Sequence, residues 1–150
     1  MQELKQKVIS YYKQQVQDRE DAFRDMIAAL TEDAANDAKG SAGDKHETAL
    51  SMMHLEQEKL NAKLGEILTQ KAFLSKLDAD TTHKKIAVGS LVKANEMYLF
   101  VSLALPKITI DGHTIIALSP QSPLGAKIIG VEVGYSFEIN GTDYRIEAIQ

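Results

Sequence analysis

The stretch AKGSAGDKH, residues 38–46, separates two long runs in which apolar residues recur at alternating steps of three and four. Such alternation is the heptad seam of a coiled coil. Gly40 and Gly43 supply the backbone freedom that a reversal needs. The sequence therefore predicts an antiparallel two-helix coiled coil that folds back between Ser41 and Ala42. The predicted seam residues are Ile9, Tyr12, Val16, Arg19, Phe23, Met26 and Leu30 in the first helix, and Leu50, Met53, Gln57, Leu60, Leu64, Ile67, Lys71 and Leu74 in the second.

This reversal also predicts which seam residues face one another. Leu30 is expected to face Met53, and Tyr12 is expected to face Lys71, because each pair is equally distant from the fold-back point. A register slipped by one heptad preserves the pattern but moves the reversal away from the middle of the glycine pair. Polar seam residues, of which Lys71 is one, cost stability and can fix the register.

The first helix is expected to cover about residues 3–38 and to be roughly 50 Å long. A two-helix arm of this length buries only a narrow seam, so it either projects or dimerises. Extra apolar residues at Leu4, Val8 and Ile27 keep a four-helix-bundle dimer open as an alternative.

Charge and composition exclude several classes of protein. The 150 residues include no Cys, which excludes disulfide-stapled folds, thiolate zinc sites and Cys nucleophiles. The net charge of −4 argues against binding nucleic acid through a broad basic face, and we expect no sequence-specific DNA binding. The longest apolar run, residues 97–105, is far shorter than the roughly 20 residues of a membrane span. We expect a soluble, cytoplasmic protein with no membrane partner.

Composition also divides the chain into two domains. Residues 1–80 hold 15 acidic against 11 basic side chains, whereas residues 81–150 hold six of each. All three Pro and six of the nine Gly lie in residues 81–150. A segment nearly free of helix breakers favours helix, and one rich in turns and β-branched residues favours strands. We predict a coiled-coil arm over 1–80 and a second domain over 81–150.

The second domain is predicted to be a small α+β domain with a mostly antiparallel sheet and one short helix. Ser122 is a natural helix N-cap, Pro123 suits the first turn, and Gly130 suits the C-terminal cap. Asn140-Gly141 favours a type I′ turn between two strands. The predicted strand regions are 86–95, 97–105, 114–119 and the hairpin 134–149.

Two carboxylates mark the end of the predicted arm. Asp44 and Glu47 stand three residues apart, which is the spacing of a helix capping box. The same spacing places two carboxylates on one helix face, where they can offer oxygen ligands to Mg²⁺. Two carboxylates hold Mg²⁺ weakly, so another macromolecule would have to supply the remaining ligands. Capping and metal binding are compatible, and both interpretations remain open.

Several motifs together resemble the bacterial Gre transcript cleavage factors, GreA and GreB. Ser122-Pro123-Leu124-Gly125, continuing through Ala126–Gly130 to Val133-Gly134, resembles their C-terminal signature. Gly43-Asp44-x-x-Glu47 resembles the Gly-Asp-x-x-Glu tip of their coiled coil and lies at the same place in the chain. The resemblance implies an FKBP-like C-terminal domain, in which Ser122, Pro123, Leu124 and Gly125 belong to the fold signature and need not touch a partner.

The resemblance also implies a function. Gre factors bind bacterial RNA polymerase through the C-terminal domain and insert the coiled coil into the secondary channel. Carried over by the match, Asp44 and Glu47 are the catalytic and metal-binding residues, which share a Mg²⁺ ion with the polymerase active centre. The polymerase then cleaves the 3′ end of a backtracked transcript, so the factor itself is expected to be an accessory protein and not an enzyme. It is expected to contact the RNA only indirectly and to act as a monomer.

The tip also departs from the Gre pattern. His46 replaces a Ser, and Thr48-Ala49-Leu50-Ser51 replaces Asn-Ala-Glu-Tyr. These changes affect the expected cleavage more than the expected polymerase binding. The alternative function is therefore a non-catalytic secondary-channel binder that regulates or inhibits the polymerase. A third possibility is an interaction module that dimerises through its coiled coil.

Overall fold

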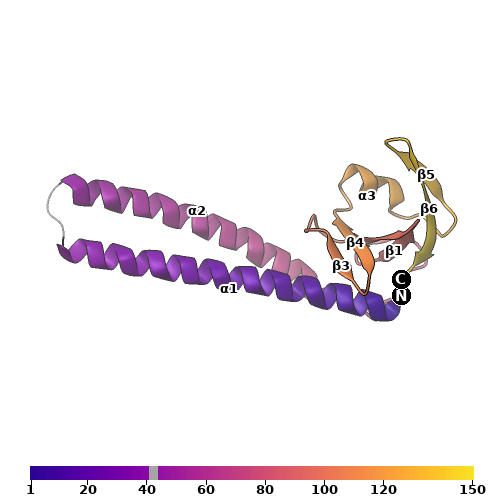
Figure 1. Cartoon of the computed structure of the whole chain (residues 1–150), viewed down its shortest axis with the longest axis horizontal. Coiled ribbons are helices and arrows are strands. Elements are labelled where there is room, and N and C mark those ends of the chain that lie inside the picture. The colour runs from indigo at the N-terminus through magenta and orange to yellow at the C-terminus, as the bar shows by residue number, and fades with distance from the viewer. Residues whose placement is uncertain (41–43) are drawn as a thin grey trace. The chain divides into compact units, whose positions relative to one another are not determined.

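The computed structural model describes the backbone of residues 1–40 and 44–150, and the side chains of residues 1–36 and 47–150. It contains two long helices followed by a six-stranded sheet with one short helix, which confirms the predicted α+β class (Figure 1). The chain forms two compact units. One, the helix pair, is Lys13–Ser75, and the other, the sheet unit, combines Met1–Tyr12 with Lys76–Gln150. No described helix has both the length and the apolarity that a bilayer span requires.

The helix pair consists of α1 (Gln2–Gly40) from Lys13 onward and α2 (Asp44–Ser75). The two helices run antiparallel and side by side, as the heptad pattern predicts (Figure 1). The predicted fold-back point, between Ser41 and Ala42, lies outside the described residues. Most predicted seam residues are at least half-buried. Of those in the helix pair, Val16, Leu64, Ile67 and Leu74 are buried, and Phe23, Leu30, Leu50, Met53, Gln57 and Leu60 are half-buried.

The seam of α1 differs from the prediction at Met26, whose side chain is exposed. Ile27 is half-buried in its place, and Glu20 is more deeply buried than the predicted Arg19. A helix with 3.6 residues per turn drifts about 20° in each heptad. One narrow stripe of such a helix contains residues 16, 20, 23, 27 and 30. Residues 19 and 26 lie outside this stripe.

The predicted facing pairs are also wrong where polar contacts test them. Lys71 forms an ion pair with Glu20, eight residues after its predicted partner Tyr12. Gln57 donates a hydrogen bond to Thr31, five residues after its predicted partner Met26. These contacts agree better with the alternative register, which is shifted by one heptad, than with the predicted one. Side chains tilt toward the N-terminus of their own helix, which means away from the turn in α1 and toward the turn in α2. Two side chains that touch therefore start from backbone positions with higher residue numbers, in both helices, than a count from the turn predicts.

The sheet has the strand order β3-β4-β2-β1-β6-β5, and every neighbouring pair is antiparallel except β2 with β4. Its core is formed mainly by Ile86, Val92, Leu99, Val101, Leu118, Ile128 and Ile146. The strands are β1 (Leu91–Ala94), β2 (Met97–Val101), β3 (Ile108–Ile110), β4 (His113–Leu118), β5 (Ser136–Ile139) and β6 (Thr142–Ile149), and the short helix is α3 (Pro123–Ile128).

The positions of the turns decide where the observed strands agree with the predicted ones. Asn140 and Gly141 have φ of 51° and 80°, as a type I′ turn requires, so the predicted hairpin is confirmed. The strand expected from residue 86 begins only at Leu91, because Gly89 bends the chain with a φ of 94°. Strand β3 was not predicted, since its three residues are too few to show an alternating pattern.

The first three turns of α1 belong to the sheet unit, so the observed division differs from the one predicted at residues 80/81. The ring of Tyr12 is buried and lies parallel to that of Phe100, with 6.0 Å between their centroids. Its hydroxyl donates a 2.7 Å hydrogen bond to the carbonyl of Pro106. The buried ammonium of Lys5 donates to the carbonyl oxygens of Thr81 and Gln150, at 2.6 and 3.2 Å. These contacts hold the helix against the sheet.

Candidate functional site

The predicted tip lies where α1 ends at Gly40 and α2 begins at Asp44. Glu47 is in the first turn of α2, and its side chain is exposed. The side chain of Asp44 lies outside the described residues, although its backbone begins the helix. The helical backbone puts positions 44 and 47 on the same face of the first turn. The structure thus places one of the two predicted ligands in solvent at the start of a helix.

Glu47 has the chemistry expected of a ligand for a hard cation. A carboxylate offers oxygen atoms, which Mg²⁺ prefers, and an exposed side chain is able to reach a partner. The N-terminal turn of a helix also favours a nearby negative charge. Among the described residues, no group of three or more His, Cys, Asp and Glu side chains is arranged to hold a metal ion.

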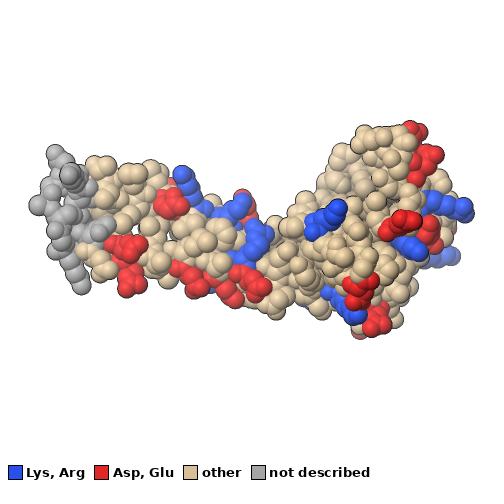
Figure 2. Space-filling model, in the orientation of Figure 1, with Lys and Arg blue, Asp and Glu red and all other residues tan. Residues whose placement is uncertain are grey.

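Acidic side chains are frequent on the helix pair. Figure 2 shows them mostly along the α1 side of the visible face, up to the grey residues at the end. A negative surface of this kind attracts cations and repels phosphate groups. This surface therefore does not favour direct binding to a nucleic acid backbone. Among the α1 side chains of this unit that the structure describes, the exposed acidic ones are Asp18, Asp21, Asp25, Glu32 and Asp33.

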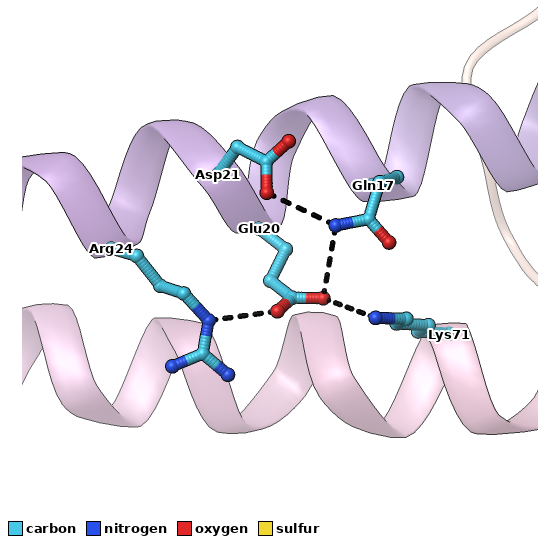
Figure 3. A network of polar contacts seen from close by, with 5 residues as sticks. All are labelled: Gln17, Glu20, Asp21, Arg24 and Lys71. Atoms are coloured by element: carbon cyan, nitrogen blue, oxygen red, sulfur yellow. Dashed lines mark hydrogen bonds and ion pairs between the residues drawn. The ribbon is translucent and has the colours of Figure 1, made fainter.

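A charge network around the buried Glu20, which the sequence did not predict, joins the two helices (Figure 3). The Glu20 side chain is only 8% exposed, and both of its oxygens are bonded. One accepts from Lys71 Nζ of α2 at 2.7 Å, and the other accepts from Arg24 Nε of α1 at 2.7 Å. Gln17 Nε2 lies 3.5 Å from the first oxygen and donates to Asp21 at 3.0 Å. The heptad count missed Glu20 because it lies one position after a seam residue.

The network predicts a loss of stability in acid. Hydrogen bonds from Lys71, and then from Arg24, lower the pKa of Glu20 below its ordinary value of 4.5. A carboxyl group whose pKa is lower in the folded state stabilises the fold above its unfolded-state pKa. That contribution is lost as the pH falls below about 4.5 and through the lowered value. We expect Glu20→Gln to flatten the decline in thermal stability below this pH, measured by circular dichroism. An equally steep decline in the variant would contradict the assignment.

Two hollows lie on the helix pair beside this network. One, of about 280 Å³, is lined by Lys13, Gln17, Lys71, Leu74 and Ser75. The Lys71 side chain is 46% exposed here, so solvent reaches the cation that neutralises Glu20.

The other hollow has a volume of about 240 Å³ and includes Arg24, the second partner of Glu20. Among the described side chains, none that lines either hollow is acidic. The cations of the network are thus partly open to water, while its carboxylate is not.

The signature around Ser122 forms the start of α3. The Ser122 hydroxyl accepts a 3.0 Å hydrogen bond from the amide of Gly125, which confirms the predicted N-cap, and Pro123 stands in the first turn. The same hydroxyl donates to the carbonyl of Ser119 at 2.6 Å. Gly130, with a φ of 81°, follows the helix as predicted.

Gly125 is required by a close approach of the chain. A Cβ atom at this position would lie 2.1 Å from the carbonyl oxygen of Ser119 and 2.9 Å from Pro120 Cα. No side chain fits at these distances, so α3 packs directly on the preceding backbone. The residues Ser122 to Gly125 therefore act within the fold of the sheet unit.

Apolar and aromatic residues lie partly exposed at one place on the sheet unit. The ring of Phe137 is stacked between those of Tyr135 and Tyr144, with centroid distances of 6.1 and 5.4 Å. Tyr135 is 43% exposed, and Val133 is 57% exposed. In the sequence, this surface is signalled by the alternating pattern of the predicted hairpin 134–149. Exposed apolar side chains of this kind are frequent where proteins bind other proteins.

Comparisons with known proteins identify no family. No family model matches the chain, and no curated protein matches it. Among solved structures, the chain is similar to one titled "Structure of the transcription factor Gfh1", with 18% identity over 91% of this chain and 92% of that chain. The TM-score is 0.36, a value at which the match establishes neither a shared fold nor a shared function.

Proposed function

We propose that this chain is a transcription elongation factor that binds bacterial RNA polymerase and inserts its helix pair into the secondary channel. There it stimulates the polymerase's Mg²⁺-dependent cleavage of backtracked transcripts. The observation that carries the proposal is the exposed Glu47 in the first turn of α2, within a Gly-Asp-x-x-Glu motif that resembles the Gre tip. The order of a helix pair and a sheet unit with a Ser-Pro-Leu-Gly helix start supports it.

In this proposal the factor completes a metal site and does not perform the hydrolysis itself. Glu47, together with Asp44 by resemblance, offers carboxylate oxygens, and the polymerase supplies the remaining ligands. When bound, the ion would polarise a phosphoryl oxygen and activate water for phosphodiester hydrolysis. The helix pair positions the carboxylates, and the sheet unit is the proposed attachment to the polymerase.

The tip is tested with Asp44→Asn and Glu47→Gln. Asn is a good N-cap and Gln serves in a capping box, so both variants should keep their thermal stability. Each removes the charge that a hard cation needs, and we expect cleavage of backtracked complexes to fall about 10²-fold. The assay measures shortened RNA in stalled complexes over time.

Glu58→Gln is the matched control, because Glu58 is an exposed carboxylate of α2 beyond the first turn. It should leave both cleavage and stability unchanged. Unchanged cleavage in both tip variants would show that the tip has no catalytic role. Loss of polymerase binding in the tip variants would assign the tip to attachment instead.

The differences between this tip and the Gre tip favour one alternative function, which the same assay tests. His46 and Thr48–Ser51 differ from the Gre pattern, which favours a channel binder without cleavage activity. In that case the wild-type protein inhibits RNA synthesis by the polymerase, and the RNA in backtracked complexes is not shortened. Light scattering tests dimerisation, since a dimer that buries the helix pair could not insert it.

A further inference from the structure

Burial changes sharply along the helix pair. Val16, Glu20, Leu64 and Ile67 are all buried, whereas no described residue of 21–36 or 47–63 is. In this outer half, the apolar seam is at most half-buried. Few buried contacts mean that little free energy resists local opening or sliding of the two helices. The alignment of the two helices in this outer half, residues 21–36 and 47–63, therefore depends on the contacts made where burial ends.

On α1 the Glu20 network lies at this boundary, because Glu20 is the last buried residue described before the turn, whereas on α2 burial continues beyond Lys71 to Ile67 and Leu64. Its ion pair with Lys71 joins residues 51 positions apart, one from each helix. Arg19 donates a 3.2 Å hydrogen bond to Gln70 at the same level, so two contacts join the helices here. Figure 3 shows the Glu20 carboxylate between the two ribbons, with Arg24 on one side and Lys71 on the other.

Apolar residues can pack against one another in several registers, but a buried carboxylate is satisfied only where it meets a cation. A slip of one heptad toward the turn would place Glu20 opposite Leu64, which is buried and apolar. The opposite slip would place it beyond Ser75, the last residue of α2. In either case the carboxylate would lose its partner from α2. It would keep Arg24, which lies on the same helix, but losing one of its two cationic partners is unfavourable for a carboxylate that is only 8% exposed. The ion pair therefore favours the observed register.

We propose that the Glu20–Lys71 ion pair fixes the register of the two helices and thereby positions the outer half of the pair, including Glu47. Both are positioning residues, and the link to Glu47 rests on the proposed function. The seam pattern included Lys71 as a polar residue able to fix the register, but only the structure shows its partner.

The register is measured by distances between spin labels. The chain has no Cys, so Ala29→Cys and Ser51→Cys, both at exposed positions of the outer half, give one label on each helix. We expect one narrow distance distribution in the otherwise wild-type protein. Glu20→Gln and Lys71→Met should each broaden or shift it, and Lys71→Arg should restore it. Lys71→Met keeps Arg24 beside Glu20, so it provides the test if Glu20→Gln does not fold.

Glu66→Gln is the control, because Glu66 and Lys63 form an exposed ion pair within α2 alone. It should leave the distribution unchanged. A narrow, unshifted distribution in Lys71→Met would overturn the proposal, as would broadening of the same size in Glu66→Gln.

A second measurement uses the polymerase. We expect Lys71→Met to reduce the maximal rate of transcript cleavage by up to about 10²-fold. The concentration of factor that gives half of the effect should not change, because the sheet unit is intact. If the wild-type protein has no effect on the polymerase, the proposed function fails, but the distance measurement still decides the register. If Lys71→Met broadens the distance distribution but leaves the maximal rate of transcript cleavage unchanged, the ion pair does not position Glu47.

Discussion

Gly125→Ala is expected to destabilise the protein by about 3 kcal/mol, the upper end of the usual cost of overpacking, because the new methyl group would meet backbone atoms. The Cβ would lie 2.1 Å from the carbonyl oxygen of Ser119. That oxygen already accepts hydrogen bonds from the amide and the hydroxyl of Ser122. The segment cannot move away without breaking the cap of α3. Urea denaturation of the purified variant measures the loss.

Gly65→Ala is the matched control for this substitution. Gly65 lies within α2, and a Cβ atom there would meet nothing within 4 Å. Since alanine favours the helix over glycine, this variant should be more stable by about 0.5–1 kcal/mol. Opposite signs for the two substitutions are the expected result. A similar gain at Gly125 would mean that the close approach is absent.

Tyr12→Ala is expected to cost about 3–5 kcal/mol, the usual range for removing a buried aromatic ring. The ring is buried against Phe100, so its loss leaves a cavity between α1 and the sheet. Tyr12→Phe removes only the hydroxyl that bonds to Pro106, and it should cost about 1 kcal/mol. Denaturation in urea measures both. Tyr11→Ala is the control, because Tyr11 is 46% exposed.

The Tyr12 hydroxyl also predicts a response to alkali. Burial, together with the nearby Tyr11, raises the pKa of Tyr12 to about 12. Its contribution is complete below the ordinary value of 10.0 and is lost as the pH rises from there toward 12. Tyr12→Phe should therefore lose less stability in this range. Equal losses in Tyr12→Phe and Tyr11→Phe would show that burial of the Tyr12 hydroxyl has no such effect.

Local signals predicted much of the fold. Ser122 with Pro123 predicted the start of α3, and Asn140-Gly141 predicted the last hairpin, because each motif acts over four residues or fewer. The two long helices followed from a periodic pattern uninterrupted by Pro. For the candidate site, the sequence predicted that Glu47 stands near the start of the second helix, and the structure agrees.

Features that depend on distant parts of the chain were not predictable. The burial of Glu20 depends on helix drift and on Lys71, 51 residues away. The requirement for Gly125 depends on how closely Ser119 approaches it, which no sequence pattern reveals. The polar seam did suggest a fixed register, but it did not identify the carboxylate that makes it specific.

The membership of Met1–Tyr12 in the sheet unit has a consequence for the order of folding. The helix pair is formed from neighbouring stretches of chain, so it can assemble early and fast. The sheet unit must instead bring Lys5 to Gln150, a loop closure across almost the whole chain. During synthesis its first segment leaves the ribosome long before the strands that cover it. Tyr12 must therefore wait for Phe100 of β2, and Lys5 must wait for Gln150, which follows β6, so the start of α1 stays uncovered in the nascent chain until the sheet forms.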